Sequence, residues 1–129
     1  MRARPSLGLL RVMALAATAS IAPGCSGPPA PDAAICRDVI HRLCLPVRCP
    51  VVTATFAVGD PCELDLRARS GCGQDDFTFQ EPLTRDRVLE CRLVLLRAGL
   101  EMQQHPDCED VAEMIEQCPD VTAFLGGQP

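Results

Sequence analysis

The sequence contains no Lys, no Trp and no Tyr, and only four Phe. Proteins that bind nucleic acid use Lys and Arg to neutralise phosphates and aromatic rings to stack on bases. From Cys25 onward the chain has nine Arg against seventeen Asp and Glu, a formal net charge of −8. We therefore expect no nucleic-acid partner, and the same charge opposes direct adsorption to anionic lipid headgroups.

Sequence motifs of common enzyme classes are also missing. The chain has no Gly-x-Ser-x-Gly nucleophile elbow, no phosphate-binding glycine loop and no His-Glu-x-x-His metal motif. A Ser or Cys without a base to activate it is not a catalytic nucleophile. We expect a protein that is not an enzyme, with no catalytic residues and no cofactor.

The N-terminal segment is typical of an export signal. A basic start precedes an apolar run of eleven residues, 12–22. The run is too short to cross a bilayer as a helix, which takes about 20 residues, but it suits the apolar part of a signal peptide. The following pair, Gly24-Cys25, resembles the lipobox of bacterial lipoproteins. That resemblance implies a signal peptide at 1–24 and a lipidated Cys25, whereas an ordinary signal cut after Ala19 would leave Cys25 a free thiol.

The same resemblance implies a location for the mature chain. Lipoproteins carry acyl chains on the modified Cys, and several chains together make a stable anchor in the lipid bilayer. In this class a residue other than Asp after the Cys, here Ser26, directs the protein to the outer membrane. We expect a lipidated Cys and Pro-rich tether at 25–33 and a domain at 34–129. The domain is expected to be lipid-anchored in the cell envelope, facing the periplasm or the cell surface.

The number of cysteines fits an exported, lipidated chain. There are nine, so assigning Cys25 to lipid leaves eight, enough for four disulfides. An exported compartment permits those bonds, whereas the same cysteines in the cytosol would indicate zinc. The predicted disulfide cysteines are Cys36, Cys44, Cys49, Cys62, Cys72, Cys91, Cys108 and Cys118.

The apolar patterning predicts a mainly α domain, a small disulfide-stapled bundle of about four helices. Asp32 is the expected N-cap of the first helix, which Pro46 ends. Thr84 and Asp107 are the expected N-caps of two further helices, the first of them at about 85–104. That helix is apolar around most of its circumference, so we expect neighbouring elements on several of its sides.

The segment 50–69 permits two interpretations. Residues 50–58 are rich in β-branched side chains and have no helical periodicity, which predicts an extended segment. Asp60-Pro61-Cys62-Glu63 resembles a capping box with Asp60 as the N-cap and Pro61 at the first helical position, and Gly71 suits the matching stop. The residues between alternate apolar and polar, as in a strand. Capping and propensity favour a helix at 62–69, and a short hairpin within 50–69 is the alternative.

The spacing of the cysteines also predicts how they pair. Two cysteines ten residues apart on one helix, such as Cys108 and Cys118, would be about 15 Å apart, beyond the Cα limit of ~7 Å for a bridge. A helical hairpin that turns at 104–105 instead brings Cys91 opposite Cys118, because both lie equally far from the turn. By the same logic, Cys44 pairs with Cys62 and Cys36 with Cys72, because the members of each pair lie about equally far from residues 53–54. Cys49 and Cys108 are then left to pair with each other.

Two short spacings, His41-x-x-Cys44 and His105-x-x-Cys108, could supply ligands for zinc or copper. They define an alternative function, a metal-binding or redox module that uses His and unpaired Cys. Exported cysteines are normally oxidised, so we expect no metal site. The acidic stretches 75–76 and 109–110 offer too few oxygen ligands for calcium and are expected to be surface.

The mature chain resembles, as a whole, the small cysteine-rich lipoproteins of GC-rich Gram-negative bacteria. The similarity lies in Arg-Asp-Val-Ile after Cys36, Glu-Cys-Arg-Leu around Cys91 and Cys-Pro-Asp-Val at Cys118. The resemblance brings no known activity with it. We expect a binding or structural module of the envelope whose partners are the lipid bilayer, through the anchor, and an envelope protein.

The small aromatic content leads to a prediction about stability. Each disulfide adds about 2–4 kcal/mol by restricting the unfolded chain, against about 5–15 kcal/mol for a whole small domain. Full reduction should therefore abolish cooperative unfolding at about 37 °C, measured by circular dichroism on reduced and oxidised samples. A reduced sample that still melts cooperatively above that temperature would show that packing alone is sufficient.

Overall fold

The computed structural model describes residues 30–46, 49–102 and 106–128. These residues form six α-helices and no strand, which confirms a mainly α, disulfide-rich fold and corrects the expected number of about four helices. None of these helices is both long and apolar enough to cross a membrane. The helices are α1 (Pro31–Cys44), α2 (Pro50–Phe56), α3 (Cys62–Ser70), α4 (Arg85–Met102), α5 (Cys108–Gln117) and α6 (Pro119–Leu125).

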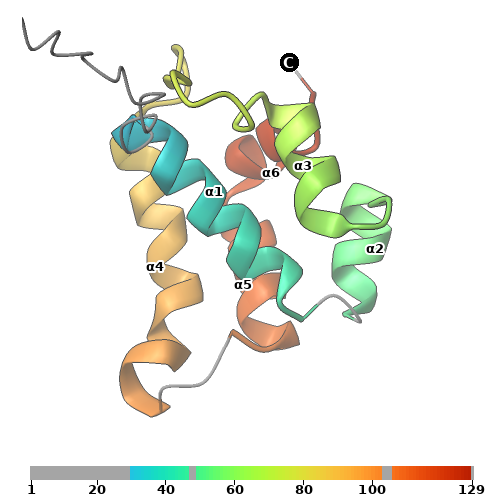
Figure 1. Cartoon of the computed structure of the whole chain (residues 1–129). Helices are drawn as coiled ribbons and strands as arrows, with labels where there is room; N and C mark the ends of the chain where they lie inside the picture. Colours follow the sequence, from blue (N-terminus) through green and yellow to red (C-terminus); the bar gives the residue numbers. More distant parts are fainter. Residues whose placement is uncertain (1–29, 47–48, 103–105, 129) are drawn as a thin grey trace, which may run out of the picture.

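The helices surround one core to which all six contribute buried side chains. Helix α1 packs against α3 and α4, and α5 packs against α2, α4 and α6 (Figure 1). Residues 71–84 cross the end of the bundle at which α1 and α4 begin (Figure 1). The largest fully buried side chains are Ile40, Leu43, Leu66, Leu95, Met114 and Leu125.

Helix α2 corrects the prediction of an extended segment at 50–58. Pro50 occupies its first turn, where a missing N–H costs nothing, and Val52 and Phe56 are buried one turn apart. Residue Cys49, directly before the helix, is bonded to Cys108. Burial of one helical face against α5 therefore overrides the β-propensity of the sequence, which is a weak preference.

Helix α3 agrees with the favoured interpretation of residues 62–69. Its buried side chains are Cys62, Leu66 and Ser70, one helical turn apart, while Leu64 is 62% exposed. A strand would have placed Leu64 on the same face as Leu66. The helix ends as expected at Gly71, whose φ of 81° lies in the left-handed region that favours glycine.

The helix starts were predicted correctly in two places and wrongly in two. The Thr84 hydroxyl accepts a hydrogen bond from the Arg87 N–H, and Asp107 makes a full capping box with Asp110. Asp32, however, is the second residue of α1, not its cap, so α1 begins inside the predicted tether 25–33. Asp60 is not a cap either, because Pro61 already stands at the N-cap position of α3.

Asp32 serves a different purpose from the predicted one. Its carboxylate is buried and accepts hydrogen bonds from the Phe79 N–H, at 3.0 Å, and from the Arg85 guanidinium. It therefore ties the start of α1 to the 71–84 segment and to the start of α4. Phe77 and Phe79 of that segment pack against the core and against Phe124 of α6.

Four disulfides are present, and their pairs agree with those that the spacing predicts. Cys36–Cys72 and Cys44–Cys62 fasten α1 to α3 and its following loop, while Cys91–Cys118 fastens α4 to the α5–α6 junction. Cys49–Cys108 joins these two halves of the chain. The Cα–Cα distances, from 5.4 to 6.1 Å, lie in the usual range. The turn at 104–105, on which the prediction was built, lies outside the described residues.

One side of helix α4 is more exposed than the sequence predicted. Val88, Cys91 and Leu95 are buried against neighbouring elements, but Leu93 is 59% exposed. Neighbours within the described chain therefore cover only part of the apolar circumference that the sequence predicted to be covered.

A non-reducing digest tests the disulfide pairing directly. Trypsin cuts only after Arg here and should release the Cys91 peptide, residues 88–92, while a glutamate-specific protease separates Cys108 from Cys118. Mass spectrometry should find the Cys91 peptide bonded to the Cys118 fragment. Recovery of Cys91 with the Cys108 fragment would contradict the fold, since Cys108 is bonded to Cys49 at the junction of α2 and α5.

Candidate functional site

The sequence-predicted site residues fall into two groups. The eight disulfide cysteines all lie in the described residues, and each is bonded. Cys108 is the exposed member of the set, whereas its partner Cys49 is buried. Cys25 lies outside the described residues, so its lipidation stays a prediction.

The two His-x-x-Cys spacings do not form a metal centre in the part of the chain that the structure describes. The His41 Nδ1 lies 2.7 Å from a carboxylate oxygen of Glu63, and Cys44 is bonded to Cys62. His105 lies outside the described residues. Among the described residues no group of three or more His, Cys, Asp and Glu is placed to hold a metal ion. The alternative of a metal-binding module would need sulfur atoms that these disulfides occupy.

The acidic stretches have structural partners. Asp75 accepts a hydrogen bond from Arg37 at 2.8 Å, and Arg37 also donates to the Cys72 and Gly73 carbonyls. Asp110 completes the capping box of α5 by accepting from the Asp107 N–H. These carboxylates therefore hold the loop and the helix start rather than a ligand.

The contact between α1 and α4 includes a shared carboxylate. Asp38 of α1 accepts hydrogen bonds from Arg42 one turn later, at 2.8 Å, and from Arg92 of α4, at 2.5 Å. Burial alone would raise the pKa of Asp38, but the bonds to Arg42 and Arg92 outweigh it and hold the pKa below its ordinary value. The i, i+4 spacing could have revealed the Arg42 pair, whereas the Arg92 pair has no local sequence signal.

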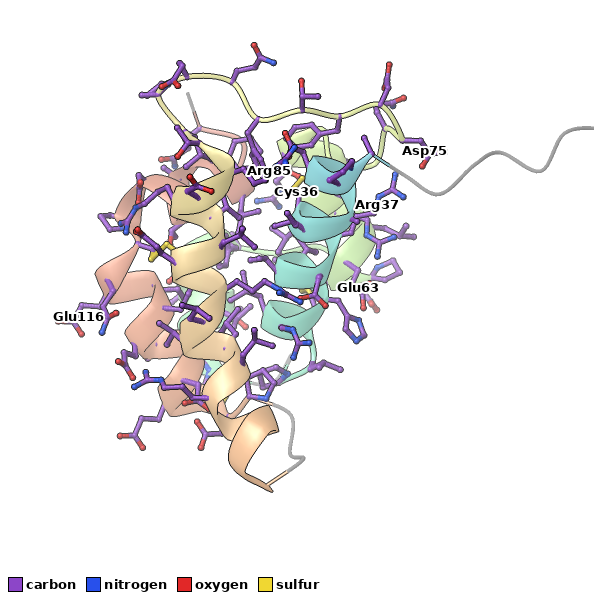
Figure 2. All side chains as sticks on the ribbon, turned by 90° about the vertical axis from the view of Figure 1, so that its left-hand side faces the viewer. Cys36, Arg37, Glu63, Asp75, Arg85 and Glu116 are labelled. Carbon is purple, nitrogen blue, oxygen red and sulfur yellow. A yellow bond between two sulfur atoms is a disulfide. The ribbon has the colours of Figure 1, made fainter. Side chains whose placement is uncertain are left out.

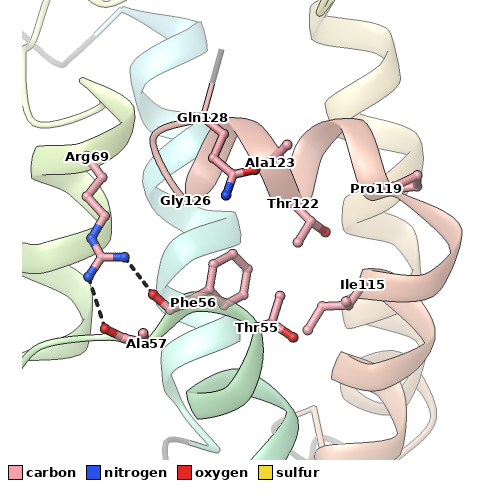
Figure 3. Close-up of a pocket in the computed structure, with 10 residues that line it drawn as sticks. All are labelled: Thr55, Phe56, Ala57, Arg69, Ile115, Pro119, Thr122, Ala123, Gly126 and Gln128. Atoms are coloured by element: carbon pink, nitrogen blue, oxygen red, sulfur yellow. Dashed lines mark hydrogen bonds between the residues drawn. The ribbon is translucent and has the colours of Figure 1, made fainter.

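Arg69 of α3 closes the end of α2. Its guanidinium donates to the Phe56 and Ala57 carbonyls, at 2.6 and 3.1 Å (Figure 3). It also donates to Asp65 on its own helix. Ala57 has a left-handed backbone, with φ of 45°, and terminates α2. Arginine at the last carbonyls of a helix satisfies acceptors that the helix itself leaves open.

An open hollow of about 450 Å³ lies beside this Arg69 contact (Figure 3). It is formed where the end of α2 meets α5, α6 and the residues after α6. No sequence motif predicts this hollow, because its walls come from the end of α2, from Arg69 of α3 and from residues 115–128, which are far apart in the sequence. The lining includes apolar Phe56, Ile115 and Ala123, together with polar Thr55, Thr122 and Gln128.

Two further hollows adjoin the 71–84 segment: one of about 480 Å³ lies at the start of α4, and one of about 390 Å³ lies against α6. Gln80 and Leu83 line both of them. Phe124 and Pro82 give the smaller one an apolar wall, whereas Asp32 and Arg85 lie at the larger one already bonded to each other. Neither hollow brings together an acid and base pair or a nucleophile with a base.

The fold and these surfaces define a class, a small all-helical domain closed by four disulfides. Comparison of the chain with protein-family models, with curated proteins and with solved structures found no significant match. The function is therefore inferred from the residues of the chain itself.

The lowered pKa of Asp38 gives a pH prediction. Its folded-state pKa lies below the ordinary value of 3.8, so the stabilisation is complete well above pH 3.8 and is lost as the pH falls through the folded-state pKa. Asp38→Asn should lower the free energy of unfolding by about 1 kcal/mol at neutral pH, with allowance for solvent screening. The deficit should shrink at acidic pH, as Asp38 becomes protonated in the wild type as well.

Thermal or denaturant unfolding at the two pH values measures this effect. Asp76→Asn removes an exposed loop carboxylate and serves as the control, which should change stability little at either pH. If Asp38→Asn lowers the free energy of unfolding equally at both pH values, the carboxylate stabilises the fold through its packing and not through its charge.

Proposed function

We propose that the protein is a lipid-anchored module of the cell envelope that acts by binding or structural support. The observation that carries this proposal is the cysteine count. Eight of the nine cysteines are bonded to one another in the described domain, and the remaining one is Cys25, at the end of the apolar N-terminal run. An odd cysteine in an exported chain needs its own explanation, and lipidation supplies it.

The disulfides support an oxidising compartment. Seven of the eight bonded cysteines are buried in or beside the single core, so the fold and the bonds depend on each other. In the reducing cytosol such bonds are rare. A chain whose core is built on four of them is suited to the envelope, the compartment to which the N-terminal segment is proposed to direct it.

The length of the tether supports a position close to the bilayer. Helix α1 begins at Pro31, so only residues 26–30 separate it from Cys25. Five residues in an extended polyproline-like conformation reach about 15 Å. The α1 start would then stay within about two helix diameters of the headgroups, while the acidic surface of the domain keeps it from adsorbing to anionic lipid.

The hollow beside Arg69 is the surface we propose for binding a peptide segment. Phe56, Ile115 and Ala123 offer an apolar floor, and the Thr55 hydroxyl and the Gln128 amide offer hydrogen bonds. The Thr122 hydroxyl already donates to the Cys118 carbonyl, so it can only accept. Charged ligands are less suited, because the Arg69 guanidinium is already bonded to two carbonyls and to Asp65. A mixture of apolar and neutral polar groups fits an uncharged stretch of an envelope protein.

Removal of the Cys25 sulfur tests the anchor. Cys25→Ser should move the protein from the membrane fraction to the soluble fraction, because no acyl chain can then be attached. The domain should stay folded with four disulfides, since Cys25 takes part in none of them. Fractionation of cells, followed by immunoblotting and intact mass, measures both properties.

Ser26→Ala is the matched control, because it changes the neighbouring residue and keeps the sulfur. That variant should remain in the membrane fraction. A wild-type protein found in the soluble fraction, with a mature N-terminus at Ser20, would contradict the proposal and establish an ordinary secretory signal.

A further inference from the structure

Helix α4 carries a leucine stripe that the described chain covers only in part. Leu93 is 59% exposed, and Leu89 and Leu96 are only half-buried. The spacing of these three residues, four and then three, is that of a coiled-coil seam. Figure 2 shows α4 in front of the bundle, with α1 beside it. The stripe is the part of the apolar circumference of α4 for which the sequence predicted a neighbour.

We propose that this leucine stripe, defined as Leu89, Leu93 and Leu96, binds the same stripe of a second copy of the chain. A surface that meets its own copy about a two-fold axis must be self-complementary. An apolar seam with a spacing of four and three satisfies this condition, because the leucines of one helix fit between those of the other.

The charges around the stripe favour a second copy over other occupants. The chain from Cys25 onward is strongly acidic, so most surfaces of two copies repel each other. The arginines of α4 are instead bonded to acids of other elements: Arg85 to Asp32, Arg87 to Asp120, Arg92 to Asp38 and Arg97 to Glu113. The surroundings of the stripe are therefore close to neutral, and two copies can meet there without strong repulsion.

The order of charges along the stripe favours an antiparallel pair of helices. Glu90 and Arg97 are seven residues apart and so lie on the same flank of the seam. Their side chains are 68% and 54% exposed. When Leu93 of one helix faces Leu96 of an antiparallel partner helix, Glu90 of each copy approaches Arg97 of the other. Each Arg97 can then bridge Glu113 of its own chain and Glu90 of the second copy.

This arrangement is compatible with two tethered chains. The two-fold axis of an antiparallel helix pair is perpendicular to both helices. If that axis lies along the membrane normal, both tethers are equivalent and both α1 starts lie at the same height above the bilayer. In this setting the inference rests on the proposed function, since anchoring in one membrane raises the effective concentration of the copies.

Co-purification of two differently tagged full-length copies tests the stripe. Leu93→Glu should reduce the yield of the second tag about tenfold or more, because it places a charge in the seam of each copy. Leu64→Glu is the matched control, since Leu64 is equally exposed but lies on α3, and its yield should equal that of the wild type. The mass of each variant should show four disulfides, so that a loss of folding is recognised.

A pair of charge reversals tests the orientation. Glu90→Arg and Arg97→Glu should each fail to self-associate, because each creates two repulsions of like charge across an antiparallel seam. A mixture of the two variants should pair as well as the wild type, since every contact between residues 90 and 97 then joins an acid to an arginine. Self-association of Arg97→Glu alone would overturn the antiparallel arrangement.

The remaining outcomes separate this inference from the anchor. Cys25→Ser copies should leave the membrane fraction and still co-purify at high concentration. The substitution removes the anchor but leaves the leucine stripe unchanged, because Cys25 is remote from the stripe in sequence. If wild-type copies do not co-purify, or if Leu93→Glu copies do, the self-association is refuted whatever the fractionation shows.

Discussion

Disulfides fix where the helices of this domain begin, and the rest of the fold depends on them. Cys49 and Cys118 are the residues directly before α2 and α6, and Cys62 and Cys108 are the first residues of α3 and α5. Helices as short as α2 and α6, with seven residues each, are unstable in isolation because nucleation costs more than one or two turns recover. A disulfide at the first turn fixes where such a helix begins, which its few residues cannot do alone. The bond also restricts the unfolded chain, most of all for Cys49–Cys108, which spans 59 residues.

Ion pairs between elements add orientation to this covalent frame. Arg85 and Arg92 of α4 bond to Asp32 and Asp38 of α1, while Arg87 reaches Asp120 of α6. Partly exposed pairs of this kind contribute little free energy each, so they align the helices more than they stabilise them. The core is mainly aliphatic, with Phe56 as its buried aromatic side chain, and the other three Phe cluster at the end of the bundle where residues 71–84 cross it. A domain with so little aromatic surface relies on its disulfides for stability.

Local signals made much of the fold predictable. The periodicity of α1, the caps Thr84 and Asp107 and the stop at Gly71 are all encoded within a few residues, and they agree with the structure. The disulfide pairs were also within reach, because helix geometry and symmetry about two turns exclude most alternatives. Residues 50–56 were not, since their β-branched side chains form a helix only when α5 is present to bury one face.

Features that depend on distant residues could not be predicted in the same way. Asp32 was expected to cap its own helix, but Arg85, more than fifty residues later, and the Phe79 N–H hold its carboxylate. The hollow beside Arg69 is assembled from three separate stretches of the chain and has no sequence motif. The exposure of Leu93 is equally non-local, because only the placement of the other helices shows which side of α4 is left uncovered.

The central claim is that eight cysteines are bonded in pairs and that the ninth, Cys25, carries lipid. Thiol alkylation of protein extracted from membranes, under denaturing conditions and followed by intact mass, tests it most directly. The account predicts no alkylated thiol without reduction and eight after reduction, on a chain that begins at Cys25 and carries acyl mass. One alkylated thiol before reduction and nine after it would show Cys25 to be a free thiol and contradict the account.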